Sequence, residues 1–282
     1  MTSIGDNAFS GCSGISSITI PSTVTRIGEK AFEGCASLTA VNISDVEKWS
    51  MIGFGNSSAN PLYYAKHLYL DEEEVTELNL ANNIRNYAFI NCAGLTEVNV
   101  KGVGTDAFKG CPKITSVKVD CETVDNWFAD SKTKVQTVTL GESVTTINAN
   151  SFDGFNALKI VYLGSNVSTI GEKAFANCGK MEDIYCYAVR YPVVESNTFE
   201  NSYMDYITLH VPAKSVNQYK AHAVWGKFMA VVPIESEETN IERVTKLNGT
   251  DSNPVIYNMN GQRINSPAKG LNIIQGRKVF IK

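Results

Sequence analysis

The chain has 282 residues, and its 43% hydrophobic and 19% charged content excludes an intrinsically disordered protein. Seven basic and two acidic residues lie in residues 241–282, which leaves 18 basic and 27 acidic residues before them and a net charge of −4 overall. The acidic first part argues against nucleic acid as a partner, and no apolar span of 18 residues is present that could form a transmembrane helix.

A 23-residue repeat begins close to the first residue and is complete in residues 4–26. Residues 1–4 (MTSI) match residues 24–27 (VTRI), so we expect the chain to begin within a repeat, and no signal peptide is present. Residues 27–35 (IGEKAFEGC) return as residues 170–178 (IGEKAFANC). Further copies carry an Ala-Phe pair or its Ser-Phe variant: Ala8-Phe9, Ala31-Phe32, Ala88-Phe89, Ala107-Phe108, Ser151-Phe152 and Ala174-Phe175. Stacked repeats of this length predict a solenoid, a fold that usually acts through a broad surface.

Each repeat ends in a segment with the alternation of a strand. In the segment that contains Val41, Asn42 and Ile43, the two apolar residues point inward and Asn42 points outward. Equivalent strands one repeat apart can pair in parallel, because the rest of the unit supplies the crossover. We therefore predict one continuous parallel ribbon, with each Ala-Phe segment forming a single helical or 3₁₀ turn beneath it.

The repeat is interrupted between residues 44 and 66. A Val-x-x-Trp pattern at Val46 and Trp49 returns at Val124 and Trp127, and it predicts a short helix in place of the Ala-Phe turn in both units. After the interruption, residues 68–70 and 78–80 are predicted strands that flank an acidic turn at residues 71–74.

These repeats resemble the BspA-like leucine-rich repeat family over residues 1–235, through the Ile-Gly-x-x-Ala-Phe-x-Gly-Cys signature. The resemblance implies a mainly β solenoid with a curved parallel sheet. It also implies export to the surface of anaerobic Gram-negative bacteria, where members are implicated in adhesion to host proteins or other cells.

The outward positions of the strands are where a partner would bind. Most of them are small or polar, whereas the last three strands place Tyr162, Tyr185 and His210 at equivalent positions, about 5 Å apart from strand to strand. Tyrosine is favoured at recognition surfaces because it combines apolar area with a polar tip. The same rings could instead only stabilise the sheet by stacking. The candidate partner-binding face comprises Lys159, Ile160, Tyr162, Asp183, Tyr185, Thr208 and His210.

The sequence contains no recognisable catalytic, cofactor-binding or metal-binding constellation. Its three histidines are isolated, and no H-E-x-x-H, nucleophile elbow, P-loop or C-x-x-C is present. Five of the seven cysteines occupy one position of the repeat, which favours a column of buried small residues over disulfides or a zinc site: Cys12, Cys35, Cys92, Cys111 and Cys178.

The last part of the chain departs from the repeat. An aromatic cluster in residues 205–235 is suited to cap the final rung. The polar residues 236–240 are a predicted linker, and residues 241–282 are a predicted small β module of two hairpins, the second turning at Gln275 and Gly276. The module resembles the sorting tail of type IX-secreted proteins, although a β module without a sorting role fits the same residues.

Three hypotheses for function follow. The first is a non-catalytic protein of the cell surface or extracellular space that binds protein or glycan on host or neighbouring cells. The second is a structural spacer or self-associating scaffold. The third is a carbohydrate-active enzyme, which would need two carboxylates facing each other across a groove. The sequence does not indicate the oligomeric state.

Overall fold

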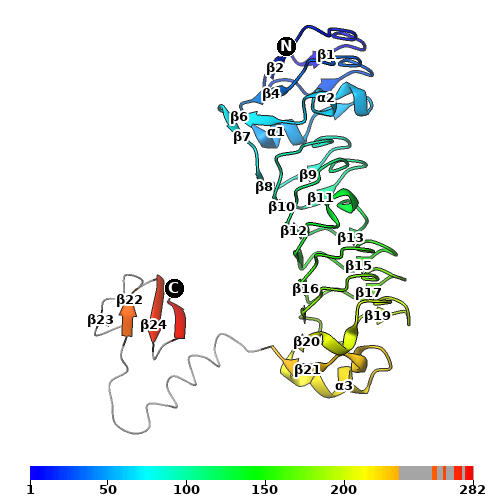
Figure 1. Ribbon diagram of the computed structural model, residues 1–282, viewed down its shortest axis with the longest axis vertical. Coiled ribbons are helices and arrows are strands. Elements are labelled where there is room, and N and C mark those ends of the chain that lie inside the picture. Colours follow the sequence, from blue (N-terminus) through cyan, green and yellow to red (C-terminus); the bar gives the residue numbers. More distant parts are fainter. Residues whose placement is uncertain (235–255, 259–262, 265–269, 275–276, 282) are drawn as a thin grey trace. The chain divides into compact units, whose positions relative to one another are not determined.

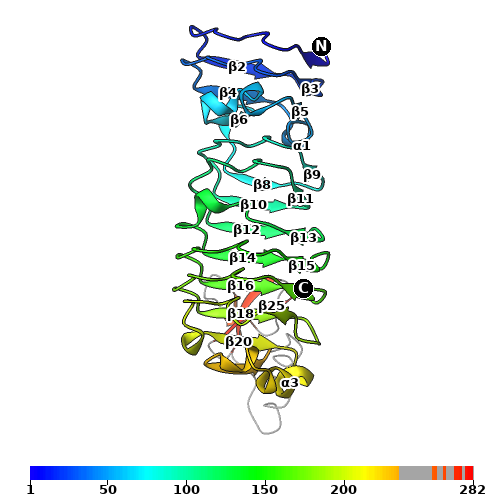
Figure 2. The same cartoon turned by 90° about the vertical axis from the view of Figure 1, so that its right-hand side faces the viewer.

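The structure is a computed structural model that describes residues 1–234 and, further on, residues 256–258, 263–264, 270–274 and 277–281. Contacts divide the chain into two compact units, Met1–Ile234 and Glu235–Lys282. The first unit is a stack of rungs whose strands lie one beneath the next (Figures 1 and 2). The predicted mainly β repeat solenoid is confirmed.

The strands that end the successive repeats form two separate sheets, so the predicted single continuous ribbon is wrong. The first sheet has the order β2-β4-β6-β7, with β2 Ser17–Ile20, β4 Ala40–Ile43, β6 Leu68–Leu70 and β7 Glu73–Glu74. The second runs from β8 to β21 and comprises β8 Glu77–Asn79, β10 Glu97–Val100, β12 Ser116–Val119, β14 Thr137–Leu140, β16 Ile160–Leu163, β18 Asp183–Cys186, β20 Thr208–Val211 and β21 Ala230–Pro233.

A hairpin causes the break between these two sheets. Asp71 and Glu72 have φ values of 49° and 72°, so the chain reverses and β7 pairs antiparallel with β6. Two successive residues with positive φ are typical of the tight turns that join antiparallel strands. The hairpin occupies the edge of β6 where the next parallel rung would otherwise pair, and β8 therefore starts a new sheet.

Period-two burial explains why these short segments are strands. In β16, Val161 and Leu163 are buried, whereas Ile160 and Tyr162 are half-buried. The pattern is the same in β4, β14, β18 and β20. A lone rung could not bury its inward side chains, so each strand is stabilised by the neighbouring rungs.

Shorter ladders run along a second side of the stack, at the Ile-Gly corner of each repeat. They are the sheets β1-β3-β5, β9-β11 and β13-β15-β17-β19. Their strands are β1 Ser3–Ile4, β3 Arg26–Ile27, β5 Gly53–Phe54, β9 Asn83–Ile84, β11 Gly102–Val103, β13 Thr123–Val124, β15 Thr146–Ile147, β17 Thr169–Ile170 and β19 Val193–Val194. Ser3 and Ile4 pair with Arg26 and Ile27, which is the register predicted from the sequence.

The Ala-Phe segments are chains of hydrogen-bonded turns and not the helical or 3₁₀ turns that we predicted. In the second rung, Ala31 N donates to Gly28 O and Glu33 N to Lys30 O, each across three residues. Lys30 and Gly34 have φ values of 56° and 78° and prevent a regular helix. The phenylalanine of this turn, Phe32, is fully buried.

The interior of the stack is organised in columns of like residues. Phenylalanine rings stack between rungs, with centroids 5.3 Å apart for Phe152 and Phe175 and 5.8 Å apart for Phe175 and Phe199. Phe199 belongs to a rung with Thr198 in place of alanine, which the sequence analysis did not recognise. Further stacked pairs in the column are Phe9–Phe32, Phe89–Phe108 and Phe108–Phe128.

A second column contains the repeated cysteines. Four of the five are buried and free, as predicted, and Cys12 at the start of the stack is partly exposed. Their thiols also donate hydrogen bonds across rungs, as from Cys178 Sγ to Phe152 O at 3.2 Å. Ser202 takes the same place in a later rung, and its hydroxyl donates to Phe175 O at 2.6 Å. The column therefore both packs and hydrogen-bonds.

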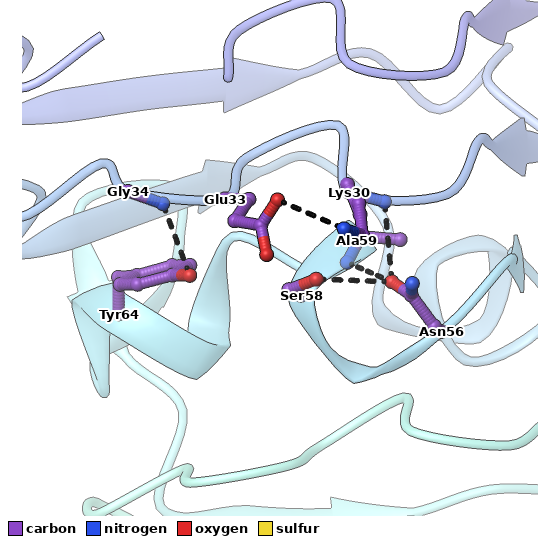
Figure 3. A network of polar contacts seen from close by, with 7 residues as sticks. All are labelled: Lys30, Glu33, Gly34, Asn56, Ser58, Ala59 and Tyr64. Carbon is purple, nitrogen blue, oxygen red and sulfur yellow. Dashed lines mark hydrogen bonds and ion pairs between the residues drawn. The ribbon is translucent and has the colours of Figure 1, made fainter. Parts of the chain in front are cut away.

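The interruption folds as a compact insertion that contains three short helical elements: α1 Val46–Ser50, η1 Ser57–Ala59 and α2 Leu62–Ala65. Asn56 Oδ1 accepts from Ala59 N at 2.9 Å and from Lys30 N at 3.2 Å, which joins the insertion to the preceding rung (Figure 3). Tyr64 accepts a hydrogen bond from Gly34 N at 3.1 Å (Figure 3). These bonds fix the insertion against the second rung.

The helix predicted at the second Val-x-x-Trp pattern is wrong. Val124 lies in strand β13, and the next short element, η2 Ala129–Ser131, begins only after Trp127. Phe128 takes the place of the Ala-Phe phenylalanine and stacks on Phe108 at 5.2 Å. The ring at position 128 therefore keeps the phenylalanine column continuous, and the 3₁₀ element η2 follows it directly.

Short helices gather at the end of the stack: η3 Met204–Tyr206 precedes β20, and η4 Ala213–Ser215, α3 Val216–Ala221 and η5 Trp225–Lys227 lie between β20 and β21. Tyr219 and Trp225 are fully buried there and meet edge to face at 5.6 Å. In the C-terminal unit, β22 Ile256–Asn258, β23 Arg263–Ile264, β24 Gly270–Ile274 and β25 Arg277–Ile281 form an antiparallel sheet of order β23-β22-β24-β25. The predicted linker 236–240 and the turn at Gln275 and Gly276 lie outside the described residues.

Candidate partner-binding face

Three parallel strands place the predicted aromatic side chains in one row. Tyr162 on β16 pairs in register with Tyr185 on β18, and Tyr185 pairs with His210 on β20. All three side chains point outward and are half-buried, whereas the residues next to them along each strand point inward and are buried. The structure thus brings together the aromatic residues that the sequence pattern aligned.

The rings in this row stack face to face. The centroids of Tyr162 and Tyr185 are 4.9 Å apart at an interplanar angle of 19°, and those of Tyr185 and His210 are 4.2 Å apart at 7°. Each ring therefore covers a face of its neighbour, and the row presents ring edges and polar tips to the outside. Such cross-strand pairs also stabilise the sheet.

The remaining predicted residues surround the row. Asp183 Oδ1 lies 2.7 Å from His210 Nε2, which fixes the imidazole against Tyr185. Ile160, Asp183 and Thr208 are in register on the three strands. Lys159 is exposed just before β16, and its Nζ lies 3.3 Å from Glu182 Oε1, a partner that the sequence analysis did not predict.

Burial also changes the acidity of the tyrosine at the centre of the row. The pKa of Tyr185 is raised, first by desolvation and then by the charge of Asp183 and by Tyr162 and Tyr187. The phenol thus stays protonated and keeps its hydrogen-bond donor. A donor beside the paired carboxylate and imidazole gives the row a mixed polar and aromatic character that suits recognition.

The outward positions of earlier strands differ in kind. Asn79 and Asn99 hydrogen-bond to each other at 2.7 Å, and Lys118 and Thr139 continue the row toward Tyr162. Within the described residues, no group of three or more His, Cys, Asp or Glu side chains is arranged to hold a metal ion. None of the described helices has the length and apolarity needed to cross a membrane.

Comparison with known families identifies the repeats. The model of the BspA type leucine-rich repeat region matches in six copies, over residues 1–125, 66–182 and 122–243. The chain belongs to this family. No curated protein matches it.

Solved structures similar to this BspA-type chain include a leucine-rich cell surface protein from Faecalibacterium prausnitzii A2-165, with 24% identity and a TM-score of 0.40 over 77% of this chain and 60% of that one. This chain therefore spans less than two thirds of that protein. The pneumococcal vaccine antigen PcpA is 15% identical, with a TM-score of 0.46 over 84% of this chain and 71% of that one. A leucine-rich repeat protein from Bacteroides ovatus ATCC 8483 is 16% identical, with a TM-score of 0.28 over 83% and 88%.

The sequence analysis of the BspA-type repeats missed a second group of exposed residues beside the row. Tyr187, Val189, Tyr191 and Val193 follow β18 and are 40%, 43%, 40% and 63% exposed. Tyr187 N donates to Leu163 O at 3.0 Å, which places Tyr187 beside the end of β16, the strand that carries Tyr162. Desolvation raises its pKa, and the charges of Tyr162 and Glu142 raise it further. The preceding rung has Gly164, Ser165 and Asn166 in the corresponding loop. Comparison of the loops between repeats, in addition to the strands, could have found this group.

Proposed function

We propose that this BspA-type repeat protein is a non-catalytic binding protein of the cell surface or extracellular space. Its partner-binding face is the stacked row of Tyr162, Tyr185 and His210 with the neighbouring Asp183. The observation that supports this proposal is the concentration of half-buried aromatic residues on three adjacent strands of a sheet whose other outward positions are mostly small or polar. Tyrosine is enriched at the energetic centres of protein interfaces.

The stacking geometry favours a protein over a glycan as the partner. A sugar ring binds an aromatic side chain best by lying against an open ring face, and here both faces of the central Tyr185 and one face each of Tyr162 and His210 are covered within the stack. The edges, the phenol groups and the Asp183–His210 pair remain for hydrogen bonds and edge contacts. These are the contacts that a protein surface makes with a tyrosine-rich patch.

A binding experiment can test both the face and the class of partner. The full chain would be applied to an array of host matrix proteins, mucins and polysaccharides, and the affinity for each captured ligand would be measured. We expect the double variant Tyr162→Ala/Tyr185→Ala to weaken binding by more than about tenfold, since truncation of a central interface residue commonly costs 2 kcal/mol or more. The matched control Ser116→Ala/Lys118→Ala changes two outward residues of β12, which β14 separates from β16 on the same sheet, and it should leave the affinity unchanged.

Three outcomes would contradict the proposal. Equal affinities for the wild type and the tyrosine variant would exclude the face. Binding to polysaccharides alone would exclude the class of partner. Binding to no ligand on the array, with the chain associating only with itself, would favour the spacer or scaffold. Circular dichroism of each variant shows whether a lost affinity reflects a lost fold.

The C-terminal unit supplies a proposal for localisation. Its resemblance to type IX sorting tails supports a role for residues 241–282 in export. Deletion of these residues should remove the protein from the cell surface and medium of its native host without reducing its amount in the cell. Unchanged surface display after the deletion would leave the module without a sorting role.

A further inference from the structure

A groove of about 370 Å³ lies on a side of the stack away from the aromatic row. It is lined by Thr25, Arg26, Gly53, Phe54, Gly55 and Arg85. The groove is at the interruption of the corner ladders, because β5 is the last strand of the sheet β1-β3-β5 and β9 is the edge of the sheet β9-β11. Its volume is at the lower end of the range for small-molecule sites.

The backbone brings two arginines to opposite sides of a glycine. Arg26 on β3 is the direct ladder partner of Gly53 on β5. Arg85 follows β9, and its backbone N–H donates to Ser50 O at 3.0 Å, which joins the rung that contains β9 to the insertion. A Cβ added to Gly53 would lie 3.8 Å from Arg85 Nη1, so the arginine side chain reaches over the glycine. Gly53 thus lies between Arg26 in the ladder and the side chain of Arg85, and both arginines line the groove.

Neither guanidinium has an acidic partner in the described part of the chain. All seven ion pairs found there use lysine or histidine, as in Lys101 with Asp120, and none uses an arginine. Glu29 packs against Gly55, where an added Cβ would lie 2.9 Å from its Cγ, but it pairs with neither arginine within 4.0 Å. Two positive charges therefore share a small groove without a countercharge from the protein among these residues.

We propose that this groove binds an oxyanion group, a carboxylate, sulfate or phosphate, carried by a small ligand. The planar guanidinium fork matches the geometry of such groups and donates two parallel hydrogen bonds to them. Glycine at position 53, where an added Cβ would meet no atom closer than 3.7 Å, lets a ligand approach the backbone closely. Gly53 N donates to Thr25 O at 3.0 Å and Gly55 N to Ile27 O at 2.9 Å, which holds β5 against the preceding rung. Asn56 and Tyr64 join the rest of the insertion to the same rung (Figure 3).

This inference does not rest on the proposed function. The groove is lined by β3, β5 and the residue after β9, whereas the aromatic row lies on β16, β18 and β20. A protein that fails to bind any macromolecule through Tyr162 and Tyr185 could still bind an anion at Arg26 and Arg85.

Isothermal titration calorimetry on the full chain tests the site with defined probes. The probes are sodium sulfate, sodium phosphate, glucuronate and glutamate, with glucose as the neutral counterpart of glucuronate, all at constant ionic strength. We expect saturable binding of at least one of the four anions, with one site per chain, and none of glucose. The ranking of the anions shows whether the natural group is an inorganic ion, an acidic sugar or an acidic amino acid.

Three variants separate charge from space. Arg26→Gln and Arg85→Gln each remove one guanidinium and should weaken anion binding by roughly tenfold or more, because hydrogen bonds to charged groups are among the strong ones. Gly53→Val keeps both charges but fills the open space at position 53 within the groove. Its new side chain starts at ordinary contact distance from Thr25 O and Arg85, 3.7 and 3.8 Å, so the strand can accept it while the ligand cannot enter.

Lys113→Gln is the matched control, since Lys113 is exposed, has no ion pair in the described residues and lies outside the groove. It should leave the affinity unchanged. The proposal is overturned if no anion binds saturably, or if Lys113→Gln weakens binding as much as Arg85→Gln, which would indicate a diffuse charge effect. It is also overturned if Gly53→Val, with its fold intact by circular dichroism, binds as the wild type does.

Discussion

The inward and outward sides of the same strands follow different rules. Inside, like residues repeat from rung to rung, as in the stacked rings of Phe152, Phe175 and Phe199. Outside, equivalent positions change from Asn99 to Thr139 to Tyr162 within the same sheet. A substitution inside disturbs two neighbouring rungs, whereas one outside is limited mainly by contact with its cross-strand neighbours.

This difference separates the fold from the binding function. The interior columns can be shared by every rung because each rung meets the same environment above and below. The outward positions are not constrained in this way, so their residues can differ from rung to rung and form a binding surface on a few rungs only. Stability should therefore respond to changes inside and binding to changes outside, and the predictions below test that separation.

The largest effect is expected at the centre of the phenylalanine column. Phe175→Ala removes a fully buried ring that stacks on two others, which should lower the free energy of unfolding by about 3–5 kcal/mol. Urea denaturation followed by circular dichroism measures the loss. Thr139→Ala on the outward side should change it by less than about 0.5 kcal/mol. Equal losses for the two variants would show that the two sides are not separable.

A smaller loss is expected at Ser202, which occupies the cysteine column. Its buried hydroxyl donates to Phe175 O at 2.6 Å and accepts from Cys178 N at 3.0 Å. Ser202→Ala should cost about 1–3 kcal/mol, because these backbone groups lose their partner. Ser202→Cys should recover part of that cost, since Cys178 makes the corresponding bond to Phe152 O. Denaturation of the three proteins in parallel measures the difference, and a cysteine variant no better than the alanine variant would refute the shared role.

The cysteine column should also make stability depend on alkaline pH. Burial raises the pKa of Cys92 and of Cys178 from the ordinary value of 9.0 to about 12. Above pH 9 the unfolded thiols ionise while the folded ones stay protonated, so the stability that these groups provide is complete below pH 9 and is lost as the pH rises toward 12. Each such thiol should contribute a decline of about 1.4 kcal/mol per pH unit.

Removal of one thiol isolates this effect. Cys178→Ala is expected to be less stable than the wild type at pH 7 and to lose stability less steeply between pH 9 and 11. Denaturation midpoints at intervals of half a pH unit provide the slopes. Between pH 6 and 8 the slopes of the two proteins should coincide, because the thiol is then protonated in both states. Parallel curves above pH 9 would contradict the assignment.

The strands and the interior were predictable from the sequence because burial enforces a period of two. The alternation around Val41 and Ile43 is sufficient to place a strand and to orient its side chains. The break after β6 was not predictable in this way. It depends on positive φ at Asp71 and Glu72, neither of which is the glycine that usually signals such a turn.

The Val-x-x-Trp pattern also folds differently in the two rungs that contain it. Trp49 follows Val46 within helix α1, whereas Trp127 precedes Phe128, whose ring completes the phenylalanine column. The outcome depends on contacts with the adjacent rungs, which a local pattern does not contain. The aromatic row was predictable because register aligns strand positions, while Tyr187 and Tyr191 were missed because loops have no fixed period.

The smallest effect on stability is expected for Tyr185, in the middle of the outward row. Tyr185→Phe keeps the ring and its stacking on Tyr162 and His210, so the free energy of unfolding should stay within about 0.5 kcal/mol of wild type. Tyr185→Ala loses the stacking and should cost about 0.5–1.5 kcal/mol. Affinity for the partner should not follow stability if the Tyr185 hydroxyl contacts the partner. Tyr185→Phe would then bind weakly although its stacking and its stability are intact. If both variants bind the partner as the wild type does, and Tyr185→Ala is less stable, then the row stabilises the sheet and does not take part in binding.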